Sequence, residues 1–252
     1  MTTSYGSDLF TEPEKSADTL ANLGPLAPLA GIWEGEPGAN VHPVLGGANE
    51  DEKVYVERYE LHPIDGQTNG PQLFYGLRYH VHITKPGEVG TFHDQVGYWL
   101  WEPARHTILH TLAIPRGQVL LAVGQAEPDA TEFEVAATAG DPDYGIASNS
   151  FLNEAFRTTS FTMKVTVNPD GTWTYFEESV MVLPDRPDPF SHTDGNTLHK
   201  VGEPTLNPLA QRALEVAQSA AVSGEVTLDA VDAAGEPARV DGSLGIGSLH
   251  AE

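Results

Sequence analysis

The feature that most constrains the fold is a succession of short segments rich in β-branched and aromatic residues, spaced about ten residues apart. They include "KVYVERYELH", "QLFYGLRYHVHIT", "TFHDQVGYWLWEP", "HTILHTLAIP", "FRTTSFTMKVTVN" and "TWTYFEESVMVLP". Turn-forming pairs such as Pro86-Gly87 and Arg116-Gly117 separate them, and no helical pattern intervenes. A series of short strands without helices predicts an all-β sandwich or barrel.

Apolar and polar side chains alternate within these segments. The segment from Leu73 to Ile83 has one apolar face, made of Leu73, Tyr75, Leu77, Tyr79, Val81 and Ile83. The segment from Phe161 to Val167 repeats the pattern. A meander of such strands buries its apolar face and removes exposed edges by closing on itself. We therefore expect an antiparallel up-and-down β-barrel of about ten strands, wide enough to hold a small ligand.

Composition divides the chain into three parts. Residues 1–23 are small, polar and acidic and predict a flexible leader, residues 24–203 carry the barrel, and residues 204–252 form a tail. Within the tail, "LNPLAQRALEVAQSAA" predicts one helix, with Asn207 as its N-cap and Pro208 at the first helical position. The remainder is low in complexity apart from one candidate strand at residues 225–231.

Charge and composition exclude several classes of partner. The 252-residue chain has 36 acidic and 13 basic residues, a formal charge of −23. The resulting field repels nucleic acids and anionic membrane surfaces, so we exclude both as partners. The absence of cysteine excludes disulfides, thiolate metal sites and thiol nucleophiles. There is neither a basic and apolar leader nor a run of about 18 apolar residues, so we expect a cytoplasmic protein.

The ten histidines are the main candidates for chemistry. His80 and His82 alternate on one strand face, but two ligands are too few for a metal site, so we expect exposed or hydrogen-bonded side chains. His106 and His110 lie about 13 Å apart along a strand and cannot bind one ion together.

Glu57 and Glu60 form the most suggestive pair of carboxylates. Three residues apart on a strand, they point to opposite faces, so we assign them to the solvated surface and not to acid–base catalysis. No Gly-x-Ser-x-Gly motif or Ser-His-Asp arrangement supports nucleophilic catalysis.

The segment "DPFSHTDGNTLHKVG" contains two histidines, His192 and His199, at the place where the strand-rich region ends. From the residues alone, the simpler interpretation is that His192 caps a turn with Asp194 and Asn196.

Five separated motifs carry a family resemblance. The strand-rich region is preceded by "GPLAPLAGIWEGE", which contains a Gly-x-Trp-x-Gly sequence, and is followed in order by "PQLFYGLRYHV", "TFHDQVGYWLWEP", "RGQVLLAVG" and "MVLPDRPDPFSHTDGNTLHKV". In this order and spacing they are similar to the motifs of the nitrobindin family of heme-binding β-barrels, which resemble fatty-acid-binding proteins and lipocalins in outline. The resemblance covers residues 25–201.

The resemblance implies a heme b site inside one end of the barrel. In the family, the histidine of the closing segment is the proximal ligand of the iron, and His192 stands at that position. His199, seven residues later, is then expected to point away or to lie on the last strand. An axial imidazole on a rigid turn at a barrel mouth is a suitable iron ligand.

The other residues that the resemblance implies lie around the same pocket. His93 matches the family's histidine on the side opposite the proximal ligand, and Phe92 matches its apolar neighbour. Met181 and Ile114 fall near positions that line the cavity. A distal imidazole of this kind can bond a bound ligand or restrict water.

The chain departs from the family near its first strand. Where the family has Tyr-Pro-Thr, with the threonine near the heme, this chain has His42-Pro43-Val44 and so lacks the hydroxyl. The segment at residues 37–52 and the loop "PIDGQTNGP" are also longer than the family's. These differences bear on ligand identity and activity more than on the fold.

Members of the family are associated with reversible nitric oxide binding by ferric heme and with isomerisation of peroxynitrite to nitrate. The resemblance therefore implies a small-molecule ligand, either a diatomic gas or peroxynitrite, and a peroxynitrite isomerase activity.

Two other functions and one assembly stay open. One alternative is a heme-free carrier of fatty acid or another apolar ligand, but Arg78 faces away from Tyr75 and Tyr79 and cannot clamp a carboxylate with them. Another is a structural or regulatory domain with an empty pocket. A homodimer, with the tail helix packed on a partner subunit, also stays open.

Overall fold

A computed structural model describes the backbone of residues 5–43, 50–184 and 186–223 and, within these ranges, the side chains outside residues 36–54 and 222–223. The strands are β1 (Gly31–Pro43), β2 (Glu50–Asn69), β3 (Gln72–Thr84), β4 (Thr91–Glu102), β5 (Thr107–Ile114), β6 (Gln118–Gln125), β7 (Glu132–Thr138), β8 (Ile146–Ser148), β9 (Arg157–Val167), β10 (Trp173–Val182) and β11 (Phe190–Gly202). The 3₁₀ helices are η1 (Leu20–Asn22), η2 (Gly24–Leu29) and η3 (Pro103–Arg105), and the α-helices are α1 (Ser150–Ala155) and α2 (Pro208–Ser223).

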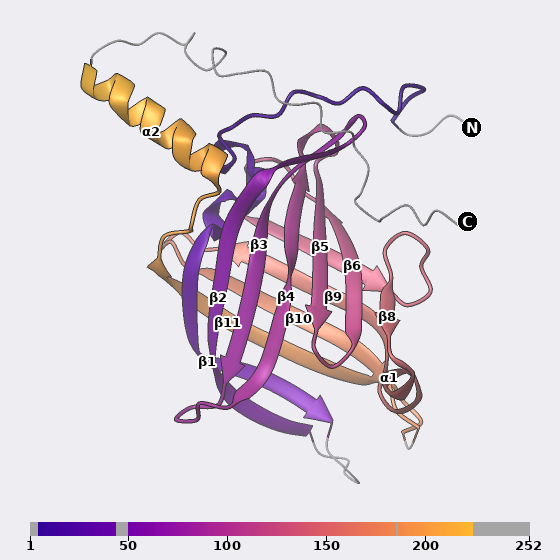
Figure 1. The fold of residues 1–252 in the computed structure, drawn as a ribbon. Coiled ribbons are helices and arrows are strands. Elements are labelled where there is room, and N and C mark those ends of the chain that lie inside the picture. The colour runs from indigo at the N-terminus through magenta and orange to yellow at the C-terminus, as the bar shows by residue number, and fades with distance from the viewer. Residues whose placement is uncertain (1–4, 44–49, 185, 224–252) are drawn as a thin grey trace, which may run out of the picture.

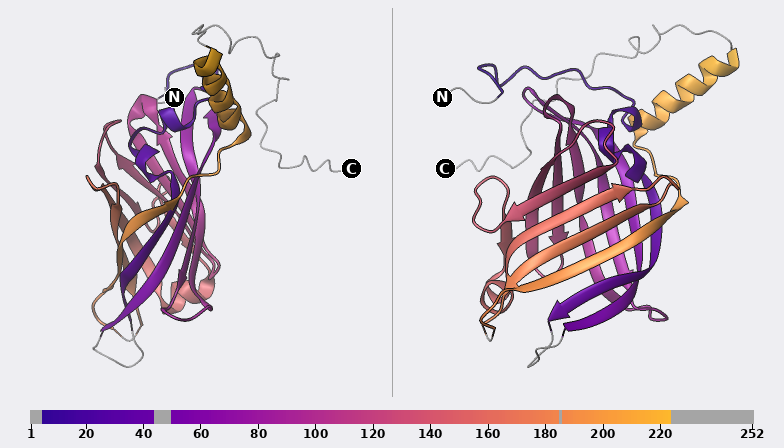
Figure 2. Two further views of the ribbon diagram at one scale, coloured as in Figure 1. Left: turned by 90° about the vertical axis from the view of Figure 1, so that its left-hand side faces the viewer. Right: turned by 180° about the vertical axis from the view of Figure 1, so that it is seen from behind.

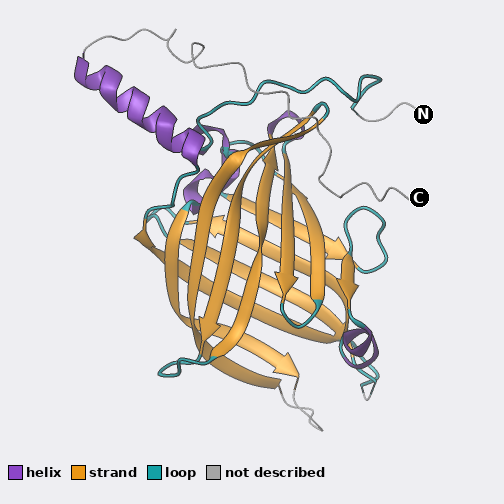
Figure 3. Cartoon of the chain, viewed as in Figure 1, coloured by secondary structure: helices purple, strands orange, loops and turns teal. Residues whose placement is uncertain are grey.

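The strands form a closed antiparallel barrel (Figure 1, Figure 3). Among the described residues, the ring runs β1-β2-β3-β4-β5-β6-β7-β9-β10-β11 and closes through the pairing of β11 with β1. The short strand β8 lies outside this ring and pairs only with β6. The prediction of an up-and-down barrel of about ten strands is confirmed.

The alternation of side chains sets the interior of the barrel. The inward positions of β3 that are buried are the predicted ones, Tyr75, Leu77, Tyr79, Val81 and Ile83. Phe161, Met163 and Val165 of β9 face them in the same core, with Trp33, Trp99 and Trp173. Large aromatic side chains therefore fill most of the barrel and leave space only towards one end.

The helices η1 and η2 lie at one end of the barrel, from which α2 also leaves (Figure 2). Leu23, Leu26 and Leu29 are fully buried there and belong to the core. The turns between β3 and β4 and between β5 and β6 lie at the opposite end (Figure 1). One end is therefore plugged by leucines, and the other carries these turns together with the short helix α1.

The Gly-x-Trp-x-Gly sequence fixes how β1 begins. Gly31 has a φ of +149°, and a Cβ atom there would lie 2.7 Å from Lys200 Cε. The indole of Trp33 donates a 2.8 Å hydrogen bond to the carbonyl oxygen of Leu29 and so ties β1 to the plug. A Cβ atom on Gly35 would lie 2.6 Å from the amide nitrogen of Asn196, so this glycine leaves room for a side chain of β11 to cross β1.

The tail helix α2 begins at Pro208, as the sequence predicts, and extends away from the barrel (Figure 1). Of its described side chains only Ala210 is buried, whereas Leu209, Leu214 and Val216 are exposed. The candidate strand at residues 225–231 lies outside the described residues.

The segment before the barrel forms hydrogen bonds with it. Tyr5 donates one to Glu102, and the backbone of Ser16 donates one to the hydroxyl of Tyr75. The division into leader, barrel and tail stays a prediction.

Candidate functional site

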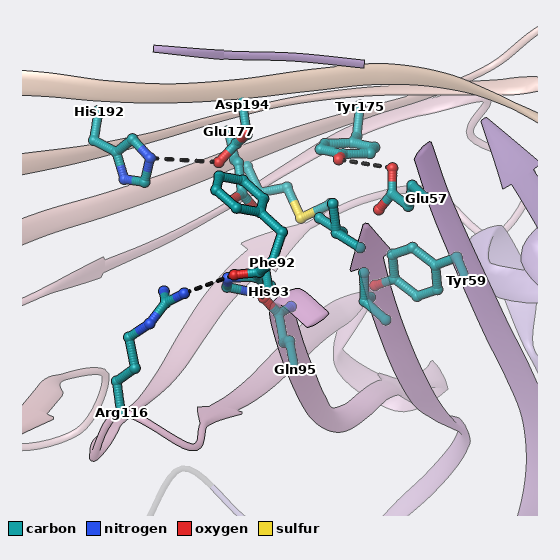
Figure 4. Close-up of a pocket in the computed structure, with 13 residues that line it drawn as sticks. Glu57, Tyr59, Phe92, His93, Gln95, Arg116, Tyr175, Glu177, His192 and Asp194 are labelled. Carbon is teal, nitrogen blue, oxygen red and sulfur yellow. Dashed lines mark hydrogen bonds and ion pairs between the residues drawn. The ribbon is translucent and has the colours of Figure 1, made fainter. Parts of the chain in front are cut away.

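A cavity of about 220 Å³ occupies the part of the barrel interior that the aromatic core leaves free (Figure 4). Its apolar and aromatic wall consists of Tyr59, Val81, Ile83, Phe92, Met163 and Tyr175. Its polar wall consists of Glu57, His93, Gln95, Arg116, Glu177, His192 and Asp194. The predicted residues His192, His93 and Phe92 therefore meet in one cavity, although His192 is about 100 residues from the other two in the sequence.

His192 reaches the cavity because it occupies an inward position of β11. Phe190, Asp194 and Asn196 share that face by the two-residue period of a strand. The Nε2 atom of His192 lies 3.6 Å from a carboxylate oxygen of Asp194. His199 lies seven residues after His192 on the same strand, an odd number that places it on the other face, and its side chain is exposed.

His93 and Phe92 are adjacent in sequence, yet both line the cavity because of a β-bulge. In the pairing of β3 with β4, Ile83 is opposite His93 and Thr84 is opposite Thr91, which leaves Phe92 as the extra residue. A bulge of this kind redirects side chains that would otherwise alternate. The chain therefore presents an apolar ring and an imidazole together on the wall facing β11.

The His93 imidazole is held in one place by a hydrogen bond. Its Nε2 atom donates to Gln95 Oε1 at 3.3 Å, and Gln95 in turn donates to the hydroxyl of Tyr79. Burial lowers the pKa of His93 below its ordinary value. The ring is therefore neutral at physiological pH, with Nε2–H committed to Gln95 and Nδ1 carrying the lone pair.

Ile114 and Met181 do not line this cavity. Met181 is directly opposite Phe190 in the pairing of β10 with β11, and Ile114 is the last residue of β5. Both are half-buried. Their role as heme contacts stays a prediction, while Met163 of β9 supplies the thioether that does line the cavity.

Glu57 is the main correction to the sequence analysis. Its side chain is 1% exposed and points into the barrel, so the assignment to solvated surface is wrong for this residue. Glu60 does lie on the outer face, where it forms an ion pair with Arg58. The tyrosine hydroxyl of Tyr175 and the amide of Asn196 both donate to Glu57 Oε2, at 2.9 and 3.1 Å. These two donors satisfy the buried oxygen that the sequence analysis placed in water.

Two further carboxyl groups face the cavity from neighbouring strands. Glu177 of β10 and Asp194 of β11 are directly opposite each other in the strand pairing. Burial, and then the charges of Asp194 and Glu57, raise the pKa of Glu177 well above its ordinary value. The polar wall is therefore acidic in composition but is not fully ionised at neutral pH.

Basic side chains lie near the turns at the open end. The guanidinium of Arg116 donates a 2.8 Å hydrogen bond to the carbonyl oxygen of Phe92, at the bulge (Figure 4). The ammonium of Lys85 lies 5.9 Å from the centre of the Phe92 ring. Since the chain is strongly acidic as a whole, these cations form a local region of opposite charge.

The other candidate histidines have structural partners. His80 pairs with Asp94 at 3.0 Å, and His82 bonds the hydroxyl of Thr91 at 3.1 Å, so both are hydrogen-bonded strand histidines. Within the described residues no group of three or more histidine, aspartate or glutamate side chains is arranged to hold a metal ion.

His110 lies in the core. It stacks on Trp99 with ring centres 3.9 Å apart, and its Nε2 atom is 2.9 Å from the hydroxyl of Tyr79. Because that hydroxyl gives its proton to the carbonyl oxygen of Thr111, His110 Nε2 is the donor. Its Nδ1 atom is buried without a hydrogen-bond partner among the described residues.

The family follows from a comparison with family models. The model that matches is the THAP4-like, heme-binding β-barrel domain, and the match covers residues 22–200. The chain belongs to this family. The resemblance to nitrobindins is thereby confirmed, and heme is the cofactor that membership of this heme-binding family supports. The His42-Pro43-Val44 departure cannot be placed, because these side chains lie outside the described residues.

Solved structures show the same fold. Of 11 matching chains, the crystal structure of Rv2717c from M. tuberculosis aligns with a TM-score of 0.50 and 20% sequence identity, over 72% of this chain and 96% of that one. This likeness concerns the fold alone. No curated protein sequence matches the chain. None of the helices in the described ranges is long and apolar enough to span a membrane.

Proposed function

We propose that this member of the THAP4-like heme-binding family binds heme b through His192 and reacts with nitric oxide or peroxynitrite at the ferric iron. The observation that carries the proposal is the cavity that His192 of β11 and His93 of β4 both line. These strands are four places apart around one side of the ring and six around the other, so the two imidazoles come from nearly opposite walls. With no cysteine in the chain, imidazole is the strongest axial donor available.

The residues present fit a heme in their chemistry. Val81, Ile83, Phe92 and Met163 provide apolar contact for a macrocycle, and histidine provides an iron ligand. The cavity volume of about 220 Å³ is below the range of about 300–1,000 Å³ typical of pockets that enclose a whole ligand. A bound porphyrin would therefore be only partly enclosed, and its remaining edge would reach the open end of the barrel.

The cations at the open end fit the carboxylate groups of heme. Arg116 lines the cavity and Lys85 lies close to Phe92 on the same rim. A guanidinium is suited to a carboxylate because it can form two parallel hydrogen bonds with it. We assign Arg116 to one heme propionate, with Lys85 contributing attraction at longer range.

Bound heme supplies the iron at which nitric oxide binds or peroxynitrite rearranges to nitrate. The protein's part is to hold that iron and to control its surroundings. His192 anchors the cofactor, and Phe92 and Ile83 add apolar wall on the side of His93. His93 and Gln95 add a fixed polar edge on that side.

The fatty-acid carrier is the less suitable alternative. Glu57, Glu177 and Asp194 all line the cavity and make this part of its wall polar, whereas the alkyl chain of a fatty acid requires apolar contact. Arg78, the cation considered for clamping such a ligand, has an exposed side chain.

Titration of the purified protein with hemin tests the proposal. We expect a sharp Soret band that saturates at one equivalent. The His192→Ala variant should bind hemin at least about 100-fold more weakly, since it loses the axial bond. His199→Ala is the matched control, because His199 lies on the same strand with an exposed side chain, and it should bind as the unaltered protein does.

The same titration can contradict the proposal. If unaltered protein and His192→Ala give the same spectra and affinities, the ligand assignment is wrong. If the unaltered protein gives only the broad absorbance of non-specifically bound hemin and instead takes up a fluorescent fatty acid, the carrier function replaces heme binding.

A further inference from the structure

Glu57 is a buried acid that heme binding by His192 does not require. It is 1% exposed, and its neighbours Tyr59 and Tyr175 belong to the aromatic core, so it lies at the inner end of the cavity. Figure 4 shows its carboxyl group beside Tyr175, on the side away from His192 and Arg116. An isolated carboxyl group in such a place is costly unless it is hydrogen-bonded or protonated.

The fold makes specific room for this group. Glu57 is opposite Gly35 in the pairing of β2 with β1. The amide of Asn196 belongs to β11, on the other side of β1, and reaches Glu57 across Gly35, where a Cβ atom would come within 2.6 Å of it. Gly35, the second glycine of the Gly-x-Trp-x-Gly sequence, therefore leaves the room in which Asn196 of β11 reaches Glu57.

Both donors bind the same oxygen of Glu57. Tyr175 donates its proton to Oε2 at 2.9 Å, and the hydroxyl of Tyr55 lies 2.8 Å behind it, so Tyr55 must donate to Tyr175. Asn196 also donates to Oε2. Among the described residues, Oε1 has no hydrogen-bond partner, and the side chain lines the cavity. The second oxygen is therefore available to a ligand.

The surroundings decide whether Oε1 carries a proton. Burial, with a smaller contribution from the charge of Asp194 on β11, raises the pKa of Glu57 to about 7, against the lowering effect of the hydrogen bonds from Tyr175 and Asn196. The remaining charged or titratable groups facing the cavity are Glu177, His192, His93, Arg116 and Tyr59. A carboxylic acid in this setting is a hydrogen-bond donor near neutral pH, where an ordinary glutamate only accepts.

We propose that the carboxyl group of Glu57 is a hydrogen-bond donor, through Oε1, to a small anion at the inner end of the cavity. The inference rests on the proposed function only for the identity of the anion, which is then peroxynitrite or its product nitrate. His93 does not supply this bond in its present tautomer, because its N–H is committed to Gln95. The proton stays on Glu57, and no covalent bond forms or breaks.

The pH dependence of anion binding distinguishes a donor from a structural acid. Azide, a small anion with its own infrared band, is the probe, added to the full-length protein loaded with hemin. Two pH units above a pKa of about 7, only about one molecule in a hundred keeps the proton. Between pH 6 and pH 9 we expect the azide affinity of the unaltered protein to fall by up to about 100-fold more than that of Glu57→Gln. The amide of the variant donates a hydrogen bond at every pH, so the variant corrects for all other effects of pH.

Two further variants complete the comparison. Glu60→Gln, on the outer face of the same strand, should show the full dependence of the unaltered protein. Tyr175→Phe removes a hydrogen bond that lowers the pKa of Glu57, so it should move the midpoint of the dependence to higher pH. This second variant keeps the test decisive if Glu57→Gln does not fold.

An infrared titration of the heme-free protein separates this inference from the proposed function. The infrared difference spectrum, unaltered protein minus Glu57→Gln, should show a carboxylic-acid band at pH 6. This band should disappear by pH 9, and it should shift when azide is added at pH 6. An equal pH dependence of azide affinity in the unaltered protein and Glu57→Gln, or the absence of that band, would overturn the inference. Failure to bind heme would contradict the proposed function, and the infrared result would still decide this inference.

Discussion

At the scale of single residues, His93 shows how burial and a backbone irregularity act together. The bulge at Phe92 turns both side chains to the cavity, and burial lowers the pKa of His93 so that its ring is neutral. Replacing His93 by leucine should leave the hemin affinity within about twofold, because His192 still supplies the axial bond.

The same His93→Leu variant should react faster with nitric oxide. The imidazole can hydrogen-bond a water molecule that nitric oxide must displace, and leucine cannot. Loss of that hydrogen bond, worth about 1 kcal/mol, should make the association of nitric oxide roughly fivefold faster. Stopped-flow absorbance at the Soret band measures this rate. An unchanged rate would place His93 outside the ligand's path.

His110 gives a prediction for acid stability. Burial lowers its pKa to about 3, so between pH 6.5 and pH 3 the unfolded chain binds a proton that the folded chain does not. Stability therefore falls as the pH drops through this window. Between pH 6.5 and pH 4 the unaltered protein should lose about 3 kcal/mol more than His110→Phe, measured by urea unfolding at each pH. Equal losses would show that His110 is charged or solvated in the fold.

The sequence could have revealed Glu57 by the same alternation that predicted the strands. Tyr55, Glu57, Tyr59 and Leu61 share one face of β2, and three of these four are large and apolar or aromatic. A charged residue on such a face is a buried acid. The spacing between Glu57 and Glu60 does not carry this signal, because residues three apart on a strand lie on its two different faces.

At the scale of elements, alternation and turn residues were enough to predict the strands, and cap residues were enough to place α2. The bulge in β4 was not predictable from alternation, because it depends on the pairing with β3. For the same reason the sequence could name Phe92 and His93 only through the family resemblance. Residue periodicity alone would have placed them on opposite faces.

Gly35→Ala tests the element-scale account of how β1, β2 and β11 fit together. The added Cβ atom would lie 2.6 Å from Asn196 and 2.7 Å from Leu198, so the Asn196 amide must leave Glu57. We expect a loss of about 1–3 kcal/mol in the free energy of unfolding, measured with urea. Gly90→Ala is the control, since nothing lies within 4 Å of a Cβ there. Equal stability of the two variants would contradict this account of Gly35.

At the scale of the whole molecule, the class and closure of the fold were predictable because ten alternating strands have few ways to bury one face. Which end of the barrel stays open was not predictable. The open end is set by Leu23, Leu26 and Leu29, which are buried at the opposite end. The sequence of this leucine-rich segment does not specify which end of the barrel it closes. The position of the cavity is therefore a property of the assembled barrel.

The barrel should fold without its tail. Only Ala210 of α2 is buried among the described tail residues, although Asn207 at its start bonds Thr19 and Asp65. Truncation after Glu203 should lower the melting temperature by about 2–4 °C, which corresponds to about 1 kcal/mol for a domain of this size. Differential scanning calorimetry measures the shift. A truncated chain that fails to fold would show that the tail belongs to the core.

The central claim is that His192 holds a heme iron inside the open end of this barrel. The most direct measurement is the position of iron, located by its anomalous X-ray scattering in crystals of the full-length protein grown with hemin. The account predicts one iron peak within bonding distance of a ring nitrogen of His192, on the side facing His93. An iron peak bonded to another residue instead, or a barrel that contains no iron under saturating hemin, would contradict it.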